Sequence, residues 1–299
     1  LQEWMAFYEN AIGEKQAELE PLPVQYADFA QWQREWLKDE VLYQQLAYWK
    51  EELSGELPVL MLPMDRPRPP VQTHHGLTHN VLLSRSLLDK LNELSRQEGA
   101  TLFMTLLASY QSFLARYTGQ TDIIVGSPIA NRNYREIEGL IGFFVNALVY
   151  RADLSNAPAF QELLSQVRIK ALKAYEYQDV PFEKIVEVIQ PERNTSHSPI
   201  FQTMFTLQNT GQKLPELHGR NIEVMESNAP IAKFDLSLTA AEVEEGLLLT
   251  FVYRTDLFDS LTIESMAEHF GNWLNVIVEN PDKSLAKLPI LSVLQQKQL

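Results

Sequence analysis

The sequence predicts an α+β fold in which a mixed sheet is flanked by helices. Helical and strand patterns are interspersed along the chain, and strands dominate its last third with little helix between them. This order is typical of α+β proteins rather than of a strictly alternating fold. Hydrophobic residues make up 45% of the 299 residues, enough for one large domain or for two lobes with their own cores.

The start of the chain reads as a series of helices. Apolar residues recur at helical spacing in residues 1–15, and two further helices are predicted at about 26–38 and 41–54, closed by Gly55. Their aromatic residues are expected to pack in a core. Four prolines within 63–72 then predict an extended segment, which is the best internal boundary of the chain.

Helices and strands follow one another irregularly after this boundary. Alternation of apolar and polar residues from Phe234 to Thr239 indicates a strand with one wetter face. The predicted helices lie at about 87–98, 102–117, 158–176 and 181–189 and from Ser260 onward. The predicted strands lie near 79–84, 121–126, 143–151, 202–208, 220–226, 234–242 and 247–254.

Composition excludes several classes of function. The net charge is −14 and Lys and Arg form no dense run, which argues against nucleic-acid binding. No stretch reaches the roughly 20 apolar residues that span a bilayer. The chain has no cysteine, so disulfides and cysteine nucleophiles are excluded and a cytoplasmic location is favoured. It opens with LQEWMAFYEN, without Met or a signal-peptide pattern, and we expect a start inside a longer protein.

The residues alone show no complete active site. His75 and His79 have the spacing of a metal pair on a helix, but the segment reads as a strand, where they would lie roughly 13 Å apart. We therefore expect His74, His75 and His79 to be exposed or locally hydrogen-bonded. Asp179 is expected to cap a helix that begins near Pro181 rather than to act in catalysis.

Six strings of the sequence carry a resemblance to a known family. They are YADFAQW (26–32), LPMDRPRPP (62–70), YTGQTDIIVGSPIANR (117–132), IGFFVNALVYR (141–151), YQDVPFEKIV (177–186) and RNTSHSPIFQTMF (193–205). The first and the last three resemble, in order, the fourth to seventh core motifs of non-ribosomal peptide synthetase condensation domains, and the other two resemble further family segments. One such string would be weak evidence, whereas six in order are specific.

This resemblance implies a lobe of the chloramphenicol-acetyltransferase-like fold. Domains of the family have two similar α/β lobes in a V, with a tunnel between them. By this resemblance, residues 1–60 are the C-terminal part of the N-terminal lobe and residues 61–75 a Pro-rich inter-lobe linker. Residues 76–288 are then the C-terminal lobe, and residues 289–299 begin a linker toward an adenylation domain.

The resemblance also implies an activity and partners. Donor and acceptor peptidyl carrier proteins present thioesters on phosphopantetheine arms, and attack by the acceptor amine forms an amide. The domain itself binds no cofactor, and its partners are the carriers, an adenylation domain and the missing segment of the N-terminal lobe. The family's catalytic H-H-x-x-x-D-G motif is absent: His74-His75 is followed by Gly-Leu-Thr-His-Asn. We therefore expect the chain to be inactive alone.

Site residues follow from the same motifs. Asn146 is the best polar candidate, because an amide can donate a hydrogen bond to a thioester or tetrahedral oxygen. For each candidate we favour support of the site over direct contact with substrate. The substrate-facing candidates are Gly142, Asn146, Gln178, Asp179, Ser196 and Gln202, and the supporting ones are Tyr26, Asp28, Trp32, Arg151, Pro181, Phe182 and Pro199.

Two alternatives stay open. The chain could be a non-catalytic lobe that docks a carrier protein or an adenylation domain. It could also belong to an acyltransferase of the same superfamily that uses an alcohol or another amine as its nucleophile.

Overall fold

A six-stranded mixed sheet forms the centre of the molecule. The structure, a computed structural model, describes residues 2–13, 19, 21–192, 194–208, 231–291 and 295. The strand order is β1-β6-β5-β4-β2-β3. The β2-β4 and β4-β5 pairs are parallel and the other three are antiparallel. The predicted α+β class with a mixed sheet is confirmed. The strands are β1 (Gly76–Ser84), β2 (Asp122–Ile129), β3 (Asn146–Asp153), β4 (Thr203–Gln208), β5 (Leu236–Val243) and β6 (Gly246–Arg254).

The helices begin and end close to the predicted bounds. Local capping explains two of these ends: Thr101 Oγ1 accepts a hydrogen bond from the Met104 N–H at the start of α5, and Gly119 ends it with a left-handed φ of 71°. The helices are α1 (Gln2–Ala11), α2 (Tyr26–Trp36), α3 (Asp39–Glu52), α4 (Arg85–Gln97), α5 (Leu102–Thr118), α6 (Phe160–Glu176), α7 (Phe182–Ile189) and α8 (Ser260–Glu279), with short 3-10 turns η1 (Arg135–Ile137) and η2 (Leu285–Lys287).

One predicted strand begins about three residues too early. The strand expected at 143–151 begins at Asn146, and Phe143 and Val145 are instead 80% and 60% exposed in the preceding loop. The run of apolar residues therefore predicted the wrong start for this strand. In the structure residues 143–145 lie in a loop, where their side chains do not alternate across a sheet. The strand expected near 220–226 lies outside the described residues.

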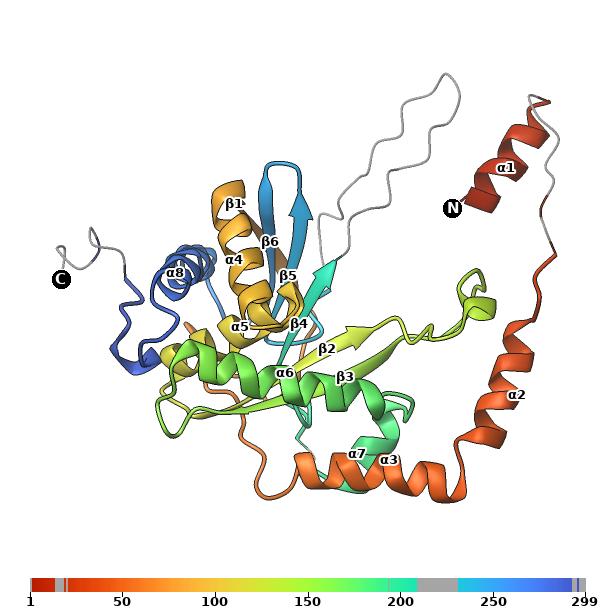
Figure 1. Cartoon of the computed structure of the whole chain (residues 1–299), viewed down its shortest axis with the longest axis horizontal. Helices are drawn as coiled ribbons and strands as arrows, with labels where there is room; N and C mark the ends of the chain where they lie inside the picture. The colour runs from red at the N-terminus through yellow and green to blue at the C-terminus, as the bar shows by residue number, and fades with distance from the viewer. Residues whose placement is uncertain are drawn as a thin grey trace.

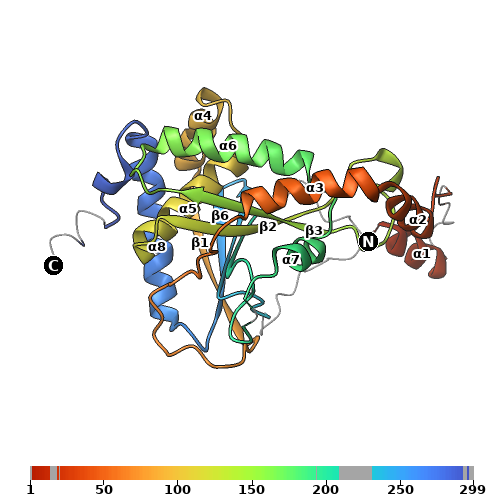
Figure 2. The same ribbon diagram turned by 90° about the horizontal axis from the view of Figure 1, so that it is seen from below.

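One face of the sheet is covered by helices. Helices α4, α5, α6 and α8 pack on it, as Figures 1 and 2 show from two directions. Strand β6 displays the resulting asymmetry: Leu249 and Phe251 are fully buried, whereas the alternate residues Thr250 and Val252 are only half-buried. The apolar period of two along β6 thus places one row of side chains in the core and leaves the opposite sheet face open.

Helix α3 and the segment after it line the other end of the sheet. Helix α3 packs on α7, and the Trp49 indole N–H donates to the Tyr177 carbonyl oxygen over 2.9 Å. Residues 54–75, called the strap below, then run to β1 without forming a helix or strand. Helix α2 stands off from the sheet in both views (Figures 1 and 2). No helix of the described residues is long and apolar enough to cross a membrane.

Candidate functional site

A cavity of about 480 Å³ lies between the open sheet face, the start of α7 and the outlying helix α2. Its walls are mainly apolar or aromatic, with a few polar groups at the rim, which is the general character of a ligand site. Its lining includes Tyr26, Phe143, Asn146, Asp179, Pro181, Phe182, Met204, Lys233 and Phe234. The cavity therefore gathers five of the residues singled out by the motifs, from three separate strings.

Asn146 is held by three hydrogen bonds at the start of β3. Its Nδ2 donates to the carbonyl oxygens of Gln178 and Val180, each over 2.9 Å. Its Oδ1 accepts from the Phe182 N–H over 3.0 Å. Since both amide hydrogens are used within the protein, this side chain in its present position has no donor left for a thioester oxygen. Asn146 thus joins β3 to the α6–α7 connection.

The predicted cap of α7 was wrong. The residue before the helix is Pro181, and the Asp179 carboxylate makes no capping bond to it. The distant Asn146 takes that role, because its Oδ1 reaches the first N–H of the helix. A sequence reading looks for caps among neighbours, and Asn146 lies 36 residues away along the chain.

Asp179 is a half-buried carboxyl at the rim of the cavity. Burial raises the pKa of Asp179, and a hydrogen bond from Gln45 opposes this shift. Gln45 Nε2 lies 3.4 Å from Asp179 Oδ2, and Gln45 Oε1 accepts from the Val180 N–H. Gln45, on α3, was not singled out from the sequence, since a buried glutamine in an aromatic helix gives no recognisable signal. The Gln178 side chain turns away and donates to the Tyr175 carbonyl oxygen.

Helix α2 and the loop before β3 meet through Tyr26 and Gly142. The Tyr26 hydroxyl donates to the Phe143 carbonyl oxygen over 3.1 Å. A Cβ on Gly142 would lie 2.2 Å from Tyr26 Cδ2, so only glycine fits against this ring. Asp28 Oδ2 accepts from the Gln25 N–H at the start of α2, and Trp32 lies edge-on to Tyr134. Tyr26, Asp28 and Trp32 therefore order α2 and its contact with the loop.

Arg151 and Gln202 fasten the strap to the sheet. Arg151 forms a forked ion pair with Asp122, which raises the pKa of its guanidinium, and also donates to the carbonyl oxygens of Ser54 and Glu56. The buried Gln202 accepts from the Leu60 N–H over 2.7 Å and donates to the Ser198 carbonyl oxygen. Neither side chain lines the cavity beside α2.

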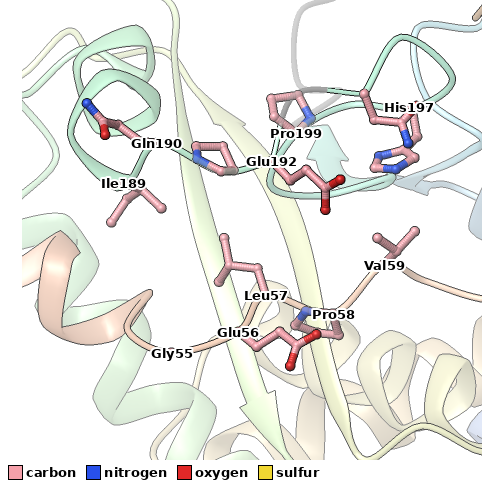
Figure 3. A pocket seen from close by; sticks show the side chains of 12 residues that line it. Gly55, Glu56, Leu57, Pro58, Val59, Ile189, Gln190, Glu192, His197 and Pro199 are labelled. Carbon is pink, nitrogen blue, oxygen red and sulfur yellow. The ribbon is translucent and has the colours of Figure 1, made fainter.

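A second hollow of about 620 Å³ lies between the strap and residues 189–192 and 194–199. Figure 3 shows Leu57 and Val59 reaching from the strap, and Glu192 from the opposite segment, toward the same space. His197 and Pro199 line it, and His197 Nδ1 lies 3.0 Å from the Ser198 carbonyl oxygen. Ser196 is half-buried beside it. The seventh motif thus contributes to both spaces, because Pro199 lines this hollow whereas Met204 lines the cavity beside α2.

A buried ion cluster escaped the sequence reading. The Asp235 carboxylate, 2% exposed, accepts hydrogen bonds from Arg68 over 2.9 Å and from the fully buried Arg254 over 3.3 Å. Both guanidinium groups also reach the Ser196 carbonyl oxygen. Asp235 fits the alternation of apolar and polar residues that predicted the strand, so it gave no sign of burial, and its two partners lie 167 and 19 residues away.

The histidine pair that first suggested a metal lies at the surface. His74 and His75 are exposed and His79 is half-buried on β1. Among the described residues, no group of three His, Asp or Glu side chains is arranged to hold a metal ion. The described lining of the first cavity also contains no His, Cys or Ser. The cavity can hold an apolar group beside a carboxyl, but its described lining supplies no imidazole base.

Known proteins of similar sequence belong to large synthetases. A family model described as the Condensation domain matches residues 1–299. A linear gramicidin synthase of Brevibacillus parabrevis is 52% identical over 301 residues, covering 100% of this chain and 6% of that protein. Surfactin synthase subunit 1 of Bacillus subtilis (strain 168) is 42% identical over 278 residues, covering 93% of this chain and 8% of that protein. The chain spans less than a tenth of these relatives' length.

Solved structures agree on the fold. The X-domain from teicoplanin biosynthesis superposes with a TM-score of 0.88 at 27% identity, over 96% of this chain and 67% of that one. The first condensation domain of the calcium-dependent antibiotic synthetase, in complex with substrate analogue 3a, gives 0.77 at 16% identity, over 97% and 62%, and supports the fold alone. The fold is thus chloramphenicol-acetyltransferase-like, and the chain belongs to the condensation domain family of non-ribosomal peptide synthetases.

Proposed function

We propose that this chain forms one side of a site where an acceptor amine attacks a donor thioester and an amide bond is made. The observation that carries the proposal is the cavity beside Asn146, which opens on the uncovered sheet face and combines apolar walls with one half-buried carboxyl. Within the described residues its lining offers no imidazole base, so that base would come from a His-His-x-x-x-Asp-Gly motif outside these residues.

The motif residues divide into two proposed roles. Asp179 is the substrate-facing candidate, because its carboxyl lies at the cavity rim and can accept a hydrogen bond from an approaching amine. Asn146, Gln178 and Gln202 support the site, since their side chains bond to the protein itself. Gly142 and Ser196 act through their neighbours, Gly142 by admitting the Tyr26 ring and Ser196 by offering its carbonyl oxygen to two arginines.

The proposal also includes partners. Donor and acceptor carrier proteins would bring their phosphopantetheine arms to this cavity, and an adenylation domain would follow in the same polypeptide. The remainder of the condensation domain would cover the loop before β3, whose Ile141 and Phe143 are 88% and 80% exposed. Such exposed apolar side chains in one short loop are typical of a surface that is buried against another body.

The test is amide formation by the longer native protein that contains these residues, supplied with donor and acceptor carriers loaded with aminoacyl groups. Met204→Trp should fill the cavity and lower the yield of dipeptidyl thioester about 100-fold or more, as a misplaced substrate would. Leu82→Trp is the matched control, because Leu82 is 53% exposed on the edge strand β1, outside the lining of the cavity. We expect the control to retain wild-type yield.

Three results would overturn the proposal. If Met204→Trp condenses as fast as wild type, the cavity does not hold the reacting groups. If the native protein binds loaded carriers but forms no amide, the lobe is a docking platform. An ester product from an alcohol acceptor, without amide from an amine, would instead identify another acyltransferase of the superfamily.

A further inference from the structure

A single cationic side chain lines the described part of the cavity beside α2. Among the described lining residues, Lys233 is the only Lys, Arg or His, whereas Asp179 and Glu183 both carry carboxyls. Lys233 is exposed, and no described residue forms an ion pair with its ammonium group. This ammonium is therefore available to a molecule that enters the cavity.

The main chain that carries Lys233 is held on both sides. The Lys233 carbonyl oxygen accepts from the strap residue Gln72 through its Nε2 over 2.9 Å, and the Ala232 N–H donates to the His74 carbonyl oxygen over 3.1 Å. Two residues after Lys233, Asp235 is buried between its two arginine partners. The base of the lysine side chain is thus fixed in the cavity wall, and a donor placed in advance stabilises charge without reorganisation.

A row of aromatic rings brings Lys233 and Asp179 to the same part of the molecule. The buried Phe201 packs between Phe182 and Phe234, with ring centroids 5.3 and 5.2 Å away. Phe182 follows Asp179 by three residues and Phe234 directly follows Lys233, and both of these rings line the cavity. One cavity therefore holds an ammonium and a carboxyl that form no ion pair with each other, so both can act on a third group.

The reaction proposed above creates two charges in such a place. When the amine nitrogen attacks the thioester carbon, the C–N bond forms and the π electron pair of the carbonyl moves to its oxygen. The nitrogen becomes positive and the oxygen negative. A proton on nitrogen then passes to the imidazole base outside the described residues, the carbonyl re-forms and the C–S bond breaks, which releases the thiolate.

The negative oxygen needs a donor that the motif residues do not supply. Asn146 was the best candidate from the sequence, but both of its amide hydrogens are bound by carbonyl oxygens of the protein. We propose that Lys233 is a catalytic residue that donates a hydrogen bond to this oxyanion, while the Asp179 carboxyl receives the positive nitrogen. Because both charges develop only on attack, the pair stabilises the intermediate more than the reactants.

This role rests on the amide-forming reaction proposed above, and its test uses the longer native protein. Lys233→Met removes the charge and keeps a long side chain. Single-turnover amide formation between carriers loaded with alanyl groups should slow about 100-fold or more, as expected for the loss of one oxyanion donor. The urea midpoint should stay unchanged, since the ammonium pairs with no described residue. Lys173→Met, at an exposed position of α6 outside the cavity lining, is the matched control and should keep the wild-type rate.

Chemical rescue separates the charge of the side chain from its size. These 299 residues contain no cysteine, so Lys233→Cys provides one thiol once any cysteine elsewhere in the protein is replaced by serine. Before the loaded carriers are added, 2-bromoethylamine converts this thiol to a side chain that ends in an ammonium, whereas 1-iodopropane gives an uncharged one of similar size. The first reagent should raise the single-turnover rate about ten-fold or more, and the second should leave it low.

Three results would overturn this role of Lys233. The first is a wild-type rate for Lys233→Met while the wild-type protein forms amide, which leaves the proposed function intact. The second is equal rescue by both reagents. The third is weaker binding of carriers with an unchanged single-turnover rate, because Lys233 would then bind the carrier or its arm and not the reacting oxygen. A wild-type protein that forms no amide would instead refute the proposed function, and this role with it.

Discussion

Asn146 Oδ1 accepts the first N–H of α7, from Phe182, over 3.0 Å, so a strand residue caps a helix that starts 36 residues later. The two Nδ2 hydrogens of the same side chain close the preceding turn on the carbonyl oxygens of Gln178 and Val180. The fifth and sixth motifs are therefore joined by one amide, and the position of the Asp179 carboxyl depends on it.

Replacing this amide should cost stability. Asn146→Ala leaves two carbonyl oxygens and one N–H without a partner in a part-buried site, and the expected loss is about 3 kcal/mol, at roughly 1 kcal/mol for each such group. Urea unfolding followed by circular dichroism measures it. Asn80→Ala, on the exposed edge of β1, should change little. Wild-type stability together with lost amide formation would instead favour direct substrate contact by Asn146.

A methyl group on Gly142 should loosen the contact between α2 and the loop before β3. In Gly142→Ala the new Cβ would stand 2.2 Å from Tyr26 Cδ2, so helix and loop must separate. Hydrogen exchange of residues 26–36 and 132–144 should accelerate together. The double variant Tyr26→Ala with Gly142→Ala should lose less stability than the two single losses added, because the clash disappears with the ring. Strict additivity would contradict the contact.

The pH dependence of stability should carry a signature of Asp179. Because burial raises its pKa in the folded state, the native carboxyl holds more protons than the unfolded one between about pH 3.9 and the native pKa. Its contribution to the free energy of unfolding is therefore present at low pH and lost as pH rises through the native pKa. Asp179→Asn removes that loss, so the variant should gain stability relative to wild type as pH rises through this window.

Asp153 provides the control of opposite sign. Hydrogen bonds from Ser155 lower the pKa of Asp153, so its stabilising contribution is present above the unfolded pKa and lost as pH falls. Asp153→Asn should accordingly lose stability relative to wild type as pH rises. Urea midpoints at a series of pH values decide both cases. A difference for Asp179→Asn that stays flat with pH would show that burial does not shift this carboxyl.

Arg151→Lys should free the start of the strap. A lysine ammonium cannot reproduce the fork that reaches Asp122 together with the Ser54 and Glu56 carbonyl oxygens. The expected cost is about 1–3 kcal/mol. Limited proteolysis should cut faster within residues 54–60. Arg85→Lys, which affects one exposed pair with Asp89, serves as the control and should leave the cleavage rate unchanged. Equal cleavage rates in all three proteins would contradict this anchoring.

The fold class could be predicted because it depends on local patterns. Helical spacing and apolar strands placed α2, α6, α7 and the described strands β4, β5 and β6 within a few residues, and the ordered motifs indicated the family. The prediction of strand bounds failed where a run of apolar residues lies on the surface, as with the exposed Phe143 and Val145. A hydrophobic period of two or 3.6 residues shows which side chains share an apolar face. It does not show which part of the protein will bury that face.

The site was predictable only in part, for a different reason. The motifs indicated Asn146 and Asp179, but the bonds that decide their roles come from residues distant in sequence. Gln45 reaches Asp179 from 134 residues away, and Arg68 reaches Asp235 from 167 residues away. Polar pairs at such separations leave no periodic signal in the sequence, so these contacts emerged only from the folded chain.

The comparison that tests the central claim most directly is dipeptidyl thioester formation by the 299-residue chain and by the longer native protein in one assay. Both receive the same donor and acceptor carriers loaded with aminoacyl groups, and product is followed by mass spectrometry of the carrier. We predict amide formation by the longer protein, and product from the 299 residues no faster than without protein, because their described cavity lining offers no imidazole base. Turnover by the 299 residues alone well above that background would contradict the account.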